Sequence, residues 1–532
     1  MTATIHKNHY SFDEFLEKRN GKNDYTDNPF LQHALKTYAG VNAAAIHEKL
    51  LEFSPKSSFR WRHLADAAGR VEARPYLVHY DAHNHRIDRV VRSKEVAALE
   101  KEIFSEGLLS EKTLDWERAG KRYLLSHNGE TSILCPMVCT EGLIALIEHF
   151  PEQQTPELKK ILNHCKEGID GNFALGAQFM TEIQGGSDIP ANKVEAVPQA
   201  DGTYRLYGNK FFCSVAHCDY AVVTARMADT GKVTTFIVPS WLSGDKKRER
   251  RNGFTINRLK NKLGTTELPT AEFEYDGAVA YPIGAKEGGV AVAVSIVLTL
   301  SRLDIGMTSG AFMMRAAREA RMYAGFREAF GQKINEFSLV AGQLQEMEEA
   351  AKRTTAGAFA IYQQYLDLGK NLIPQSFSKK HFDFRELVLL QKVATTKETV
   401  DVLRTAISVF GGNGAIEDFS SLPRIFRDAM VNELWEGPKN VLLTQVYRDL
   451  KRFSRRYTPE EFIANNLDGA PEAVIDDFSS RLKDFLSADF LLNPTQTNAK
   501  LAQQWEQFCL TFFRTYQEQQ LEKLGDQAIM NT

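Results

Sequence analysis

The chain has 532 residues, of which 43% are hydrophobic and 25% are charged, a composition typical of globular proteins with roughly three or four domains. Its formal net charge of −3 argues against any general attraction to nucleic acid or to anionic membranes. The six cysteines form no CxxC pair, so the sequence indicates neither a zinc site nor a disulfide framework, and we expect reduced, mostly buried thiols.

Neither a secretory signal nor a membrane span is predicted. The N-terminus lacks a basic segment that leads into an apolar one. The most apolar run, Val290–Leu300, is too short to cross a bilayer and is followed by Arg302. The C-terminal residues carry no lipidation or peroxisomal motif. We therefore expect a cytoplasmic protein.

The first third of the chain is predicted to be helical after a polar start. Residues 1 to about 30 are expected to be extended or loosely attached. From Asn28 to about Phe150, apolar residues recur at helical spacing. Residues 75–91 interrupt this pattern with two alternating runs around a turn, which predicts a hairpin. The hairpin holds three histidines in a polar segment without an acidic or cysteine partner set, so no metal site is expected there.

Between Ala174 and Ile283 the period of the apolar residues changes from helical to alternating. Four short β-branched or aromatic runs are separated by Asp-Gly and Thr-Gly turn signals, which predicts a small all-β domain. The runs cover residues 204–207, 220–224, 233–238 and 271–275. The charged run KKRERR, residues 246–251, is either a solvated loop, which is the favoured interpretation, or a contact for nucleotide phosphates.

Helical spacing returns from Gly288 to about Leu450. Thr458, followed by Pro459 and two glutamates, has the pattern of a new helix N-cap, so a last helical unit is predicted at residues 459–527. The predicted fold class is therefore α+β and multidomain. Its parts are an N-terminal α-helical domain, a middle β domain, a C-terminal α-helical bundle and an extra helical tail, at residues 1–173, 174–285, 286–450 and 451–532.

The strongest chemical signal lies in residues Val409–Asn440. This stretch opens with a turn rich in glycine at residues 411–414 and ends with Glu436, which stands between Leu434-Trp435 and Gly437. A carboxylate in an apolar frame is desolvated, which raises its pKa and makes it a stronger base. Gly437 would let a ligand or another backbone approach closely. The competing interpretation is a partly exposed glutamate at a helix end.

Two loops of the predicted β domain carry glycines, hydroxyl groups and aromatic rings. Residues 180–188, MTEIQGGSD, offer the hydroxyls of Thr181 and Ser187 beside two glycines. Residues 208–214, GNKFFCS, offer an aromatic pair and the hydroxyl of Ser214. A glycine-rich loop is weak evidence alone, but together these groups suit a planar heteroaromatic ring.

Seven motifs occur in order along residues 175–445. They are MTEIQGGSD at 180–188, GNKFFCS at 208–214, LSRLD at 300–304, FREAFG at 326–331, FGGNG at 410–414, RDA at 427–429 and LWEG at 434–437. In order and spacing this region resembles the acyl-CoA dehydrogenase family. In detail the chain resembles its AidB-like, alkylation-response branch, because PRIFRDAMVNELWEG, YDAHNHRIDRV and the helical tail extend the similarity to nearly the whole chain.

The resemblance implies an acyl-CoA dehydrogenase-like fold in which FAD lies between a middle β-barrel domain and the C-terminal bundle. Glu436 matches the catalytic base, and Ser187 and Arg302 match positions on the acyl-CoA side. Arg327 and Phe330 match positions that reach the FAD of a neighbouring subunit, in keeping with a homotetramer. The positions that the family would place at FAD are Met180, Thr181, Ser187, Phe212, Ser214, Arg327, Phe330, Gly411, Gly412 and Asn440.

The implied activity is α,β-dehydrogenation of an acyl-CoA thioester in fatty acid metabolism, in which the base removes the α-proton and the flavin takes the β-hydride. The alternative is an AidB-like flavoprotein that binds acyl chains or DNA in a stress response and has little dehydrogenase activity. DNA binding requires a basic face, whereas residues 446–532 carry 10 Lys and Arg against 13 Asp and Glu, which disfavours it. The chain departs from the family pattern at Gln178, where many members carry an aromatic residue, and at Pro438-Lys439, which replaces small hydroxyl residues.

Overall fold

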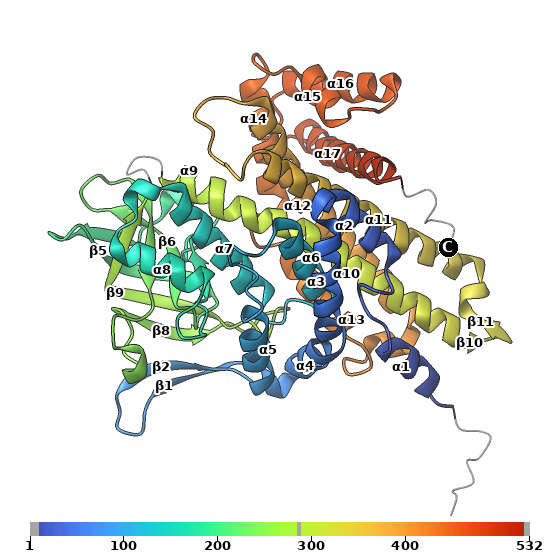
Figure 1. Ribbon diagram of the computed structural model, residues 1–532. Coiled ribbons are helices and arrows are strands. Elements are labelled where there is room, and N and C mark those ends of the chain that lie inside the picture. The colour runs from blue at the N-terminus through green and yellow to red at the C-terminus, as the bar shows by residue number, and fades with distance from the viewer. Residues whose placement is uncertain (1–9, 285–288, 526–532) are drawn as a thin grey trace, which may run out of the picture.

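The computed structural model of the protein describes residues 10–284 and 289–525. It confirms the predicted α+β class. The helices of the N-terminal part and of the C-terminal bundle lie beside a β domain, and the tail lies across the outer side of the bundle (Figure 1). The functional site described below lies where the N-terminal helices, the β domain and the bundle meet.

The N-terminal part is mostly helical. It contains α1 (Asp13–Asn20), α2 (Pro29–Ala39), η1 (Gly40–Asn42), α3 (Ala43–Pro55), η2 (Lys56–Arg60), α4 (Trp61–Ala68), η3 (Val71–Ala73), β1 (Tyr76–Tyr80), β2 (Arg86–Val91), α5 (Lys94–Phe104), α6 (Asp115–Ser126), α7 (Leu134–His149), η4 (Pro151–Gln153) and α8 (Pro156–Lys166). Helix α7 is buried along almost its whole length, because its residues are apolar on all sides.

The expectation of a loosely attached start is wrong for residues 10–30, and residues 1–9 lie outside the described part of the chain. Phe15 of α1 is 1% exposed. Its ring contacts the rings of Tyr323, Phe410 and Phe419 from the bundle. A polar helix is thus fixed by one aromatic anchor, because burying a phenylalanine contributes about 1.5–3 kcal/mol.

The hairpin predicted at residues 75–91 is present, and β1 pairs with β2 in antiparallel register. His79 Nδ1 lies 2.7 Å from Asp88 Oδ1, and His85 Nδ1 lies 3.1 Å from Asp81 Oδ2. The histidines therefore have acidic neighbours, which the sequence pattern did not indicate. Among residues 10–284 and 289–525, however, no group of three or more His, Cys, Asp or Glu side chains could hold a metal ion.

The β domain is a seven-stranded sheet that closes on itself. Its strands are β3 (Gly176–Phe179), β4 (Glu195–Pro198), β5 (Tyr204–Ser214), β6 (Tyr220–Met227), β7 (Val233–Pro239), β8 (Phe254–Leu259) and β9 (Thr270–Ile283), with short turns η5 (Ile189–Ala191) and η6 (Lys246–Arg248). The order is β3-β6-β4-β5-β9-β7, and β8 pairs with β9. Because β7 pairs with both β6 and β9, the sheet has the closed, barrel-like form that the resemblance implied.

The charged run 246–251 forms a largely exposed loop, and two of its cations have acidic partners within the β domain. Lys246 Nζ lies 2.5 Å from Asp219 Oδ1, and Arg250 Nη2 lies 2.9 Å from Asp245 Oδ1. The Arg251 guanidinium stacks 4.1 Å from the Trp241 ring centroid. These contacts agree with the solvated-loop interpretation.

The bundle and the tail complete the fold. The bundle contains α9 (Gly289–Ala293), η7 (Val294–Leu298), α10 (Thr299–Phe326), β10 (Glu328–Ala329), β11 (Gln332–Lys333), η8 (Ile334–Glu336), α11 (Ser338–Asp367), α12 (Lys379–Val409), η9 (Gly411–Ala415), α13 (Leu422–Asn432) and α14 (Lys439–Phe453). The tail contains α15 (Pro459–Asn466), α16 (Glu472–Ser487) and α17 (Gln496–Lys523). The Thr458 side chain caps α15 in a capping box with Glu461, as the sequence pattern predicted.

The apolar run at 290–300 continues into a much longer helical segment than the sequence suggested. Gly289–Phe326 is 38 residues long and apolar enough to cross a membrane by length and composition. However, 72% of its most apolar window is buried inside the protein, as expected for the central helix of a bundle. Within the described ranges no second helix meets the same criteria.

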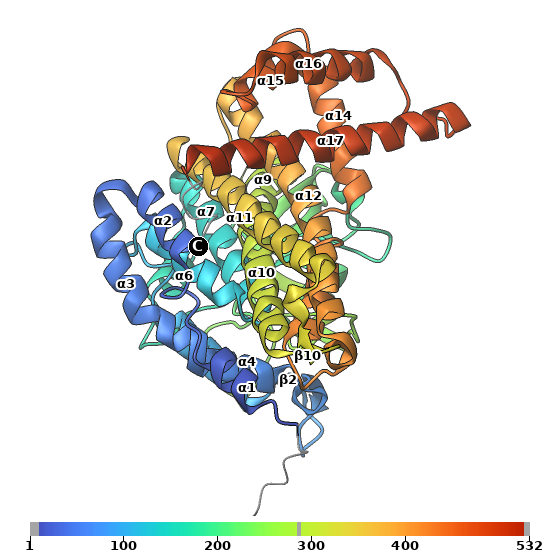
Figure 2. The same cartoon turned by 90° about the vertical axis from the view of Figure 1, so that its right-hand side faces the viewer.

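Helix α17 lies across α11 and α12 on the outer side of the bundle (Figure 2). The Trp505 indole donates to the Leu443 carbonyl oxygen at 3.1 Å, and Lys439 Nζ lies 2.6 Å from Glu506 Oε1. Both bonds attach α17 to α14, whose first residue, Lys439, stands three residues after Glu436. The tail is therefore fixed to the element that follows the predicted base.

Candidate active site

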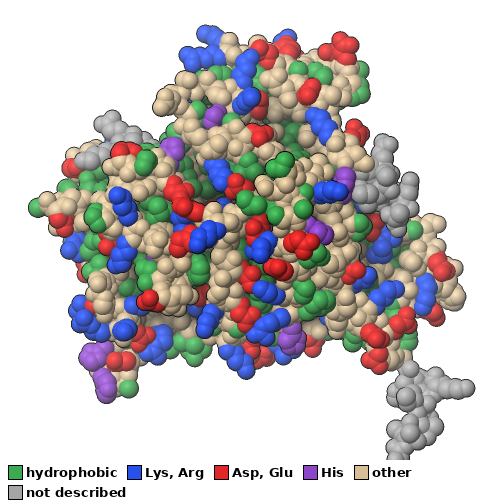
Figure 3. All heavy atoms as spheres, viewed as in Figure 1, with side chains coloured by type: hydrophobic (Ala, Val, Ile, Leu, Met, Phe, Trp, Pro, Cys, Tyr) green, Lys and Arg blue, Asp and Glu red, His purple; other side chains and the backbone are tan. Residues whose placement is uncertain are grey.

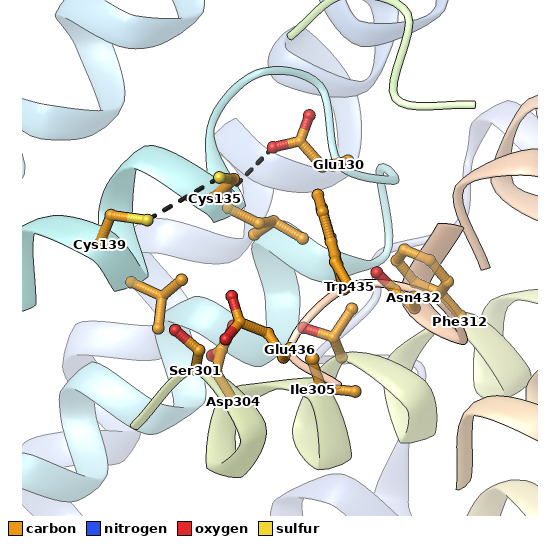
Figure 4. A pocket seen from close by; sticks show the side chains of 13 residues that line it. Glu130, Cys135, Cys139, Ser301, Asp304, Ile305, Phe312, Asn432, Trp435 and Glu436 are labelled. Atoms are coloured by element: carbon orange, nitrogen blue, oxygen red, sulfur yellow. Dashed lines mark hydrogen bonds between the residues drawn. The ribbon is translucent and has the colours of Figure 1, made fainter. Parts of the chain in front are cut away.

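Glu436 lies in a tight turn between α13 and α14, with φ of 59°. Gly437 follows with φ of 100°, and a Cβ there would lie 2.7 Å from Leu442 Cδ2. The protein's own packing and the positive φ thus favour glycine here, and the approach of a ligand at Gly437 stays a prediction. The turn directs the Glu436 side chain into a cavity (Figure 4).

The cavity beside Glu436 has a volume of about 40 Å³. Its apolar walls come from α7, α10 and the turn itself, and its polar groups come from these elements, from the loop before α7 and from the end of α13. The lining residues are Glu130, Leu134, Cys135, Val138, Cys139, Ser301, Asp304, Ile305, Thr308, Phe312, Asn432, Trp435 and Glu436. The predicted apolar frame is therefore right for Trp435 and wrong for Leu434, which is 63% exposed.

The carboxylate of Glu436 has one hydrogen-bond donor within the described structure. Gln178 Nε2 donates to Glu436 Oε1 at 2.6 Å, whereas the buried Oε2 has no partner among residues 10–284 and 289–525. Burial raises the pKa of Glu436 to about 7, although Arg302, Lys392 and the bond from Gln178 act in the opposite direction. A base with this pKa is about half ionised at neutral pH and binds a proton well.

Two buried cations hold the backbone of the turn. Arg302 Nε donates to the Glu436 carbonyl oxygen at 2.9 Å. Lys392 Nζ donates to the carbonyl oxygens of Glu433 and Gly437 at 2.8 and 2.7 Å. Burial lowers the pKa of Lys392 to about 7. Arg302, predicted on the acyl-CoA side, thus lies in the site and supports the base, and Lys392 is a site residue that the sequence analysis missed.

The loop at 180–188 presents unpaired polar groups beside β5. Neither the Thr181 amide N–H nor its hydroxyl has a hydrogen-bond partner among the residues that the structure describes. The Thr181 carbonyl accepts from the Phe211 N–H at 3.0 Å. A Cβ at Gly186 would collide with the Thr181 hydroxyl. These features leave Thr181 free to bind a polar ring edge.

A buried ion pair holds this loop in place. Lys210 Nζ lies 2.8 Å from Glu182 Oε1 and donates to the Met180 carbonyl oxygen at 3.2 Å. Both side chains are almost completely buried. Sequence reasoning missed this pair, although a lysine and a glutamate inside two glycine-containing motifs were a visible signal.

The remaining predicted residues of the β domain lie on the same loop and on β5. Ser214 Oγ lies 3.0 Å from Thr270 Oγ1, so its hydroxyl has a protein partner. Phe212 is 49% exposed, and Lys260 Nζ lies 4.5 Å from its ring centroid. Ser187 is exposed in its loop, and Asn440 is exposed at the start of α14.

Four predicted cofactor residues lie at the other end of the chain's fold. Arg327 and Phe330 belong to the β10–β11 hairpin region, which Figure 1 shows on the side opposite the β domain. Phe330 is 98% exposed. Gly411 and Gly412 lie nearby, because Tyr323 receives bonds from the Arg327 N–H at 2.8 Å and from the neighbouring Asn413 side chain at 3.0 Å. The structure thus divides the predicted residues into two separate groups.

Comparisons with known proteins identify the family. The family model described as acyl-CoA dehydrogenase, middle domain, matches residues 177–278, and the model described as acyl-CoA dehydrogenase, C-terminal domain, matches residues 287–451. Acyl-CoA dehydrogenase family member 11 of Caenorhabditis elegans is 30% identical over 441 residues, which are 80% of this chain and 70% of that protein. The chain belongs to the acyl-CoA dehydrogenase family.

Other relatives place the chain near the AidB-like branch of the acyl-CoA dehydrogenases, which are oxidoreductases. The putative acyl-CoA dehydrogenase AidB of Escherichia coli is 29% identical over 71% of this chain and 69% of its own length. The crystal structure of Caenorhabditis elegans ACDH-11 in complex with C11-CoA has a TM-score of 0.80 and 26% identity, and covers 95% of this chain and 88% of that chain.

Members of the acyl-CoA dehydrogenase family depend on FAD, and the residues of this chain fit that cofactor. The free N–H and hydroxyl of Thr181 supply hydrogen-bond donors for a ring edge, and the half-exposed Phe212 supplies an aromatic face. Because Gly186 has no side chain, the space beside the Thr181 hydroxyl stays open. When bound, FAD would be held on this side of Glu436 by residues that the sequence motifs had singled out.

Proposed function

We propose that the protein catalyses the α,β-dehydrogenation of an acyl-CoA thioester, with Glu436 as the base and FAD as the cofactor. The observation that carries this proposal is the state of Glu436. Its carboxylate is buried with one unpaired oxygen beside a cavity, and burial raises its pKa to about 7. Gln178, which donates to this carboxylate, is only three residues from Thr181, so the base and the candidate flavin-binding group Thr181 belong to one site.

Each group of the site has a separate task in this reaction. Ionised Glu436 takes the α-proton of the thioester through its free Oε2. The Glu436 amide N–H, which has no partner among the described residues, is the candidate donor to the thioester oxygen, where negative charge develops. Arg302 and Lys392 keep the turn rigid, so the base does not have to be ordered during the reaction. FAD, when bound, supplies the acceptor for the β-hydride.

The substrate class and the assembly belong to the same proposal. Acyl-CoA as substrate is supported by ACDH-11, whose structure holds C11-CoA. A homotetramer is supported by the two separate groups of predicted cofactor residues, and a cytoplasmic location and a role in fatty acid metabolism are proposed with it. The exposed Phe330 and the open Gly411 turn would serve the FAD of a neighbouring subunit, as the family resemblance implies.

The test compares three proteins under anaerobic conditions with a panel of acyl-CoAs from short to very long chains. The wild type should lose its oxidised flavin absorbance. Glu436→Gln keeps the shape of the side chain and removes the base, so it should bind FAD normally and bleach at least ~10²–10⁴ times more slowly. Glu346→Gln is the matched control, because it makes the same change at an exposed glutamate of α11 outside the cavity, and it should bleach normally.

Two results would contradict the proposal. Bleaching of Glu436→Gln at the wild-type rate would remove Glu436 from the role of base. A wild-type protein that binds FAD and acyl-CoA but never bleaches would instead be a binding protein built on a dehydrogenase fold. Purified protein that takes up no FAD would contradict the cofactor assignment.

A further inference from the structure

Gln178 connects the β domain to the predicted base. It is the one partly buried residue of β3, whose other residues are buried. Its side-chain Nε2 donates to Glu436 Oε1 at 2.6 Å and lies 3.3 Å from Ser301 Oγ on α10. One amide group thus joins β3, the catalytic turn and the central helix of the bundle.

The neighbouring cations, Arg302 and Lys392, do not donate to the Glu436 carboxylate. Arg302 donates to the carbonyl oxygen of Glu436, and Lys392 donates to the carbonyl oxygens of Glu433 and Gly437. These bonds fix the backbone of the turn. In the part of the chain that the structure describes, the Gln178 amide alone donates to the carboxylate itself.

The orientation of the Gln178 amide is determined by its surroundings. With Nε2 toward Glu436, both neighbouring oxygens, Glu436 Oε1 and Ser301 Oγ, can accept a hydrogen bond. The Gln178 Oε1 atom is then buried without a partner. A flipped amide would place this oxygen against the carboxylate, where two acceptors would repel each other. The orientation that places the donor on Glu436 therefore leaves the amide oxygen of Gln178 unpaired.

We propose that Gln178 is the positioning residue of the base, which holds Glu436 Oε1 so that Oε2 is the oxygen that takes the proton. This inference rests on the proposed dehydrogenase function. In the step, the α-carbon C–H bond breaks, its electron pair stays on the substrate and the proton bonds to Oε2. The Gln178 N–H remains on Oε1 before and after the transfer, so the carboxyl group need not rotate. A bond to an ionised group also favours its ionised form.

The first test is the pH dependence of flavin bleaching. Gln178→Leu removes the amide, which should weaken the acid strength of Glu436 by about tenfold to a hundredfold. The midpoint of the pH profile should therefore rise by about one to two pH units. Gln199→Leu, the same change in the exposed turn between β4 and β5, is the control and should leave the midpoint unchanged. A slower Gln178→Leu with an unchanged midpoint would overturn the inference and leave only a packing role.

The second test needs neither acyl-CoA nor turnover. Glu436→Gln is made in the wild-type and the Gln178→Leu backgrounds, and thermal unfolding is followed as a function of pH. The gain in stability caused by Glu436→Gln should rise with pH and become constant once Glu436 would be fully ionised in the folded protein. Without Gln178 this constant value should be reached at a higher pH. The same level-off pH in both backgrounds would refute the positioning role, even if the dehydrogenase proposal had failed. If Gln178→Leu does not fold, Gln178→Met also lacks the donor and allows the same comparison.

Discussion

Replacement of Glu436 by glutamine should stabilise the protein at alkaline pH. Burial raises the pKa of Glu436 from 4.5 to about 7. At about 1.4 kcal/mol per pKa unit, the ionised carboxylate costs the folded protein ~3.4 kcal/mol relative to the unfolded chain. The folded form has the higher pKa, so it binds more protons than the unfolded chain between pH 4.5 and about 7. Stability therefore falls as the pH rises through this window.

Glutamine is neutral at every pH and has nearly the shape of protonated Glu436. The variant should therefore match the wild type near pH 4.5 and exceed it by up to ~3 kcal/mol above about pH 7. The assay is thermal unfolding at several pH values, with equal FAD content, and the expected signal is a rise of a few degrees in the apparent Tm at about pH 8.

Glu346→Gln is the matched control for this experiment, because Glu346 is an exposed glutamate of α11. It should change the apparent Tm by little at any pH. A gain by Glu436→Gln that is equal at acid and alkaline pH would show that ionisation is not its cause. No gain at about pH 8 would show that the carboxylate is solvated, and the reasoning from burial would be refuted.

Three further predictions concern the support of the site, its cavity and its partners. Lys210→Met leaves Glu182 buried without its cation, so it should destabilise the protein by about 3–5 kcal/mol and weaken FAD binding. An apparent Tm equal to that of the wild type would contradict this. Ser309→Ala removes a buried hydroxyl of α10, next to the cavity-lining Thr308, that has no hydrogen-bond partner among the described residues, so it should raise the apparent Tm, and a lower Tm would show that the hydroxyl is satisfied by water. Duplex DNA should bind weakly, because acidic and basic side chains are interspersed over the face in Figure 3. In fluorescence anisotropy the affinity should fall as salt is added, and binding that survives near-physiological salt would refute this.

The architecture could be predicted because it depends on local patterns. The change of apolar period at Ala174 marks the start of the β domain, and β3 begins at Gly176. The capping pattern at Thr458 marks the start of the tail. The glycine-rich turn predicted at residues 411–414 directly follows the long helix α12, and its Gly411 has φ of 60°. Each of these features is determined by residues that are close in sequence.

The site could be predicted only in part, because its geometry depends on contacts between distant segments. Gln178 and Glu436 are 258 positions apart, and nothing local indicates that they meet. Leu434 is exposed although its neighbour Trp435 lines the cavity, so adjacency in sequence gave the wrong apolar frame. The polar start was mistaken for a loose segment because the anchor of Phe15 is formed by aromatic residues more than 300 positions away.

The attachment of α17 makes the catalytic turn sensitive to cleavage far from it. Residues 492–495 of the connection between α16 and α17 are exposed and are a natural site for a protease. After a cut there, α17 would no longer be covalently connected to α14, and the bonds of Trp505 and Glu506 to α14 would join two separate chains. Release of α17 would then free the start of α14, three residues after the base. Nicking of the tail would thus weaken the support of the catalytic turn without altering any residue of the cavity.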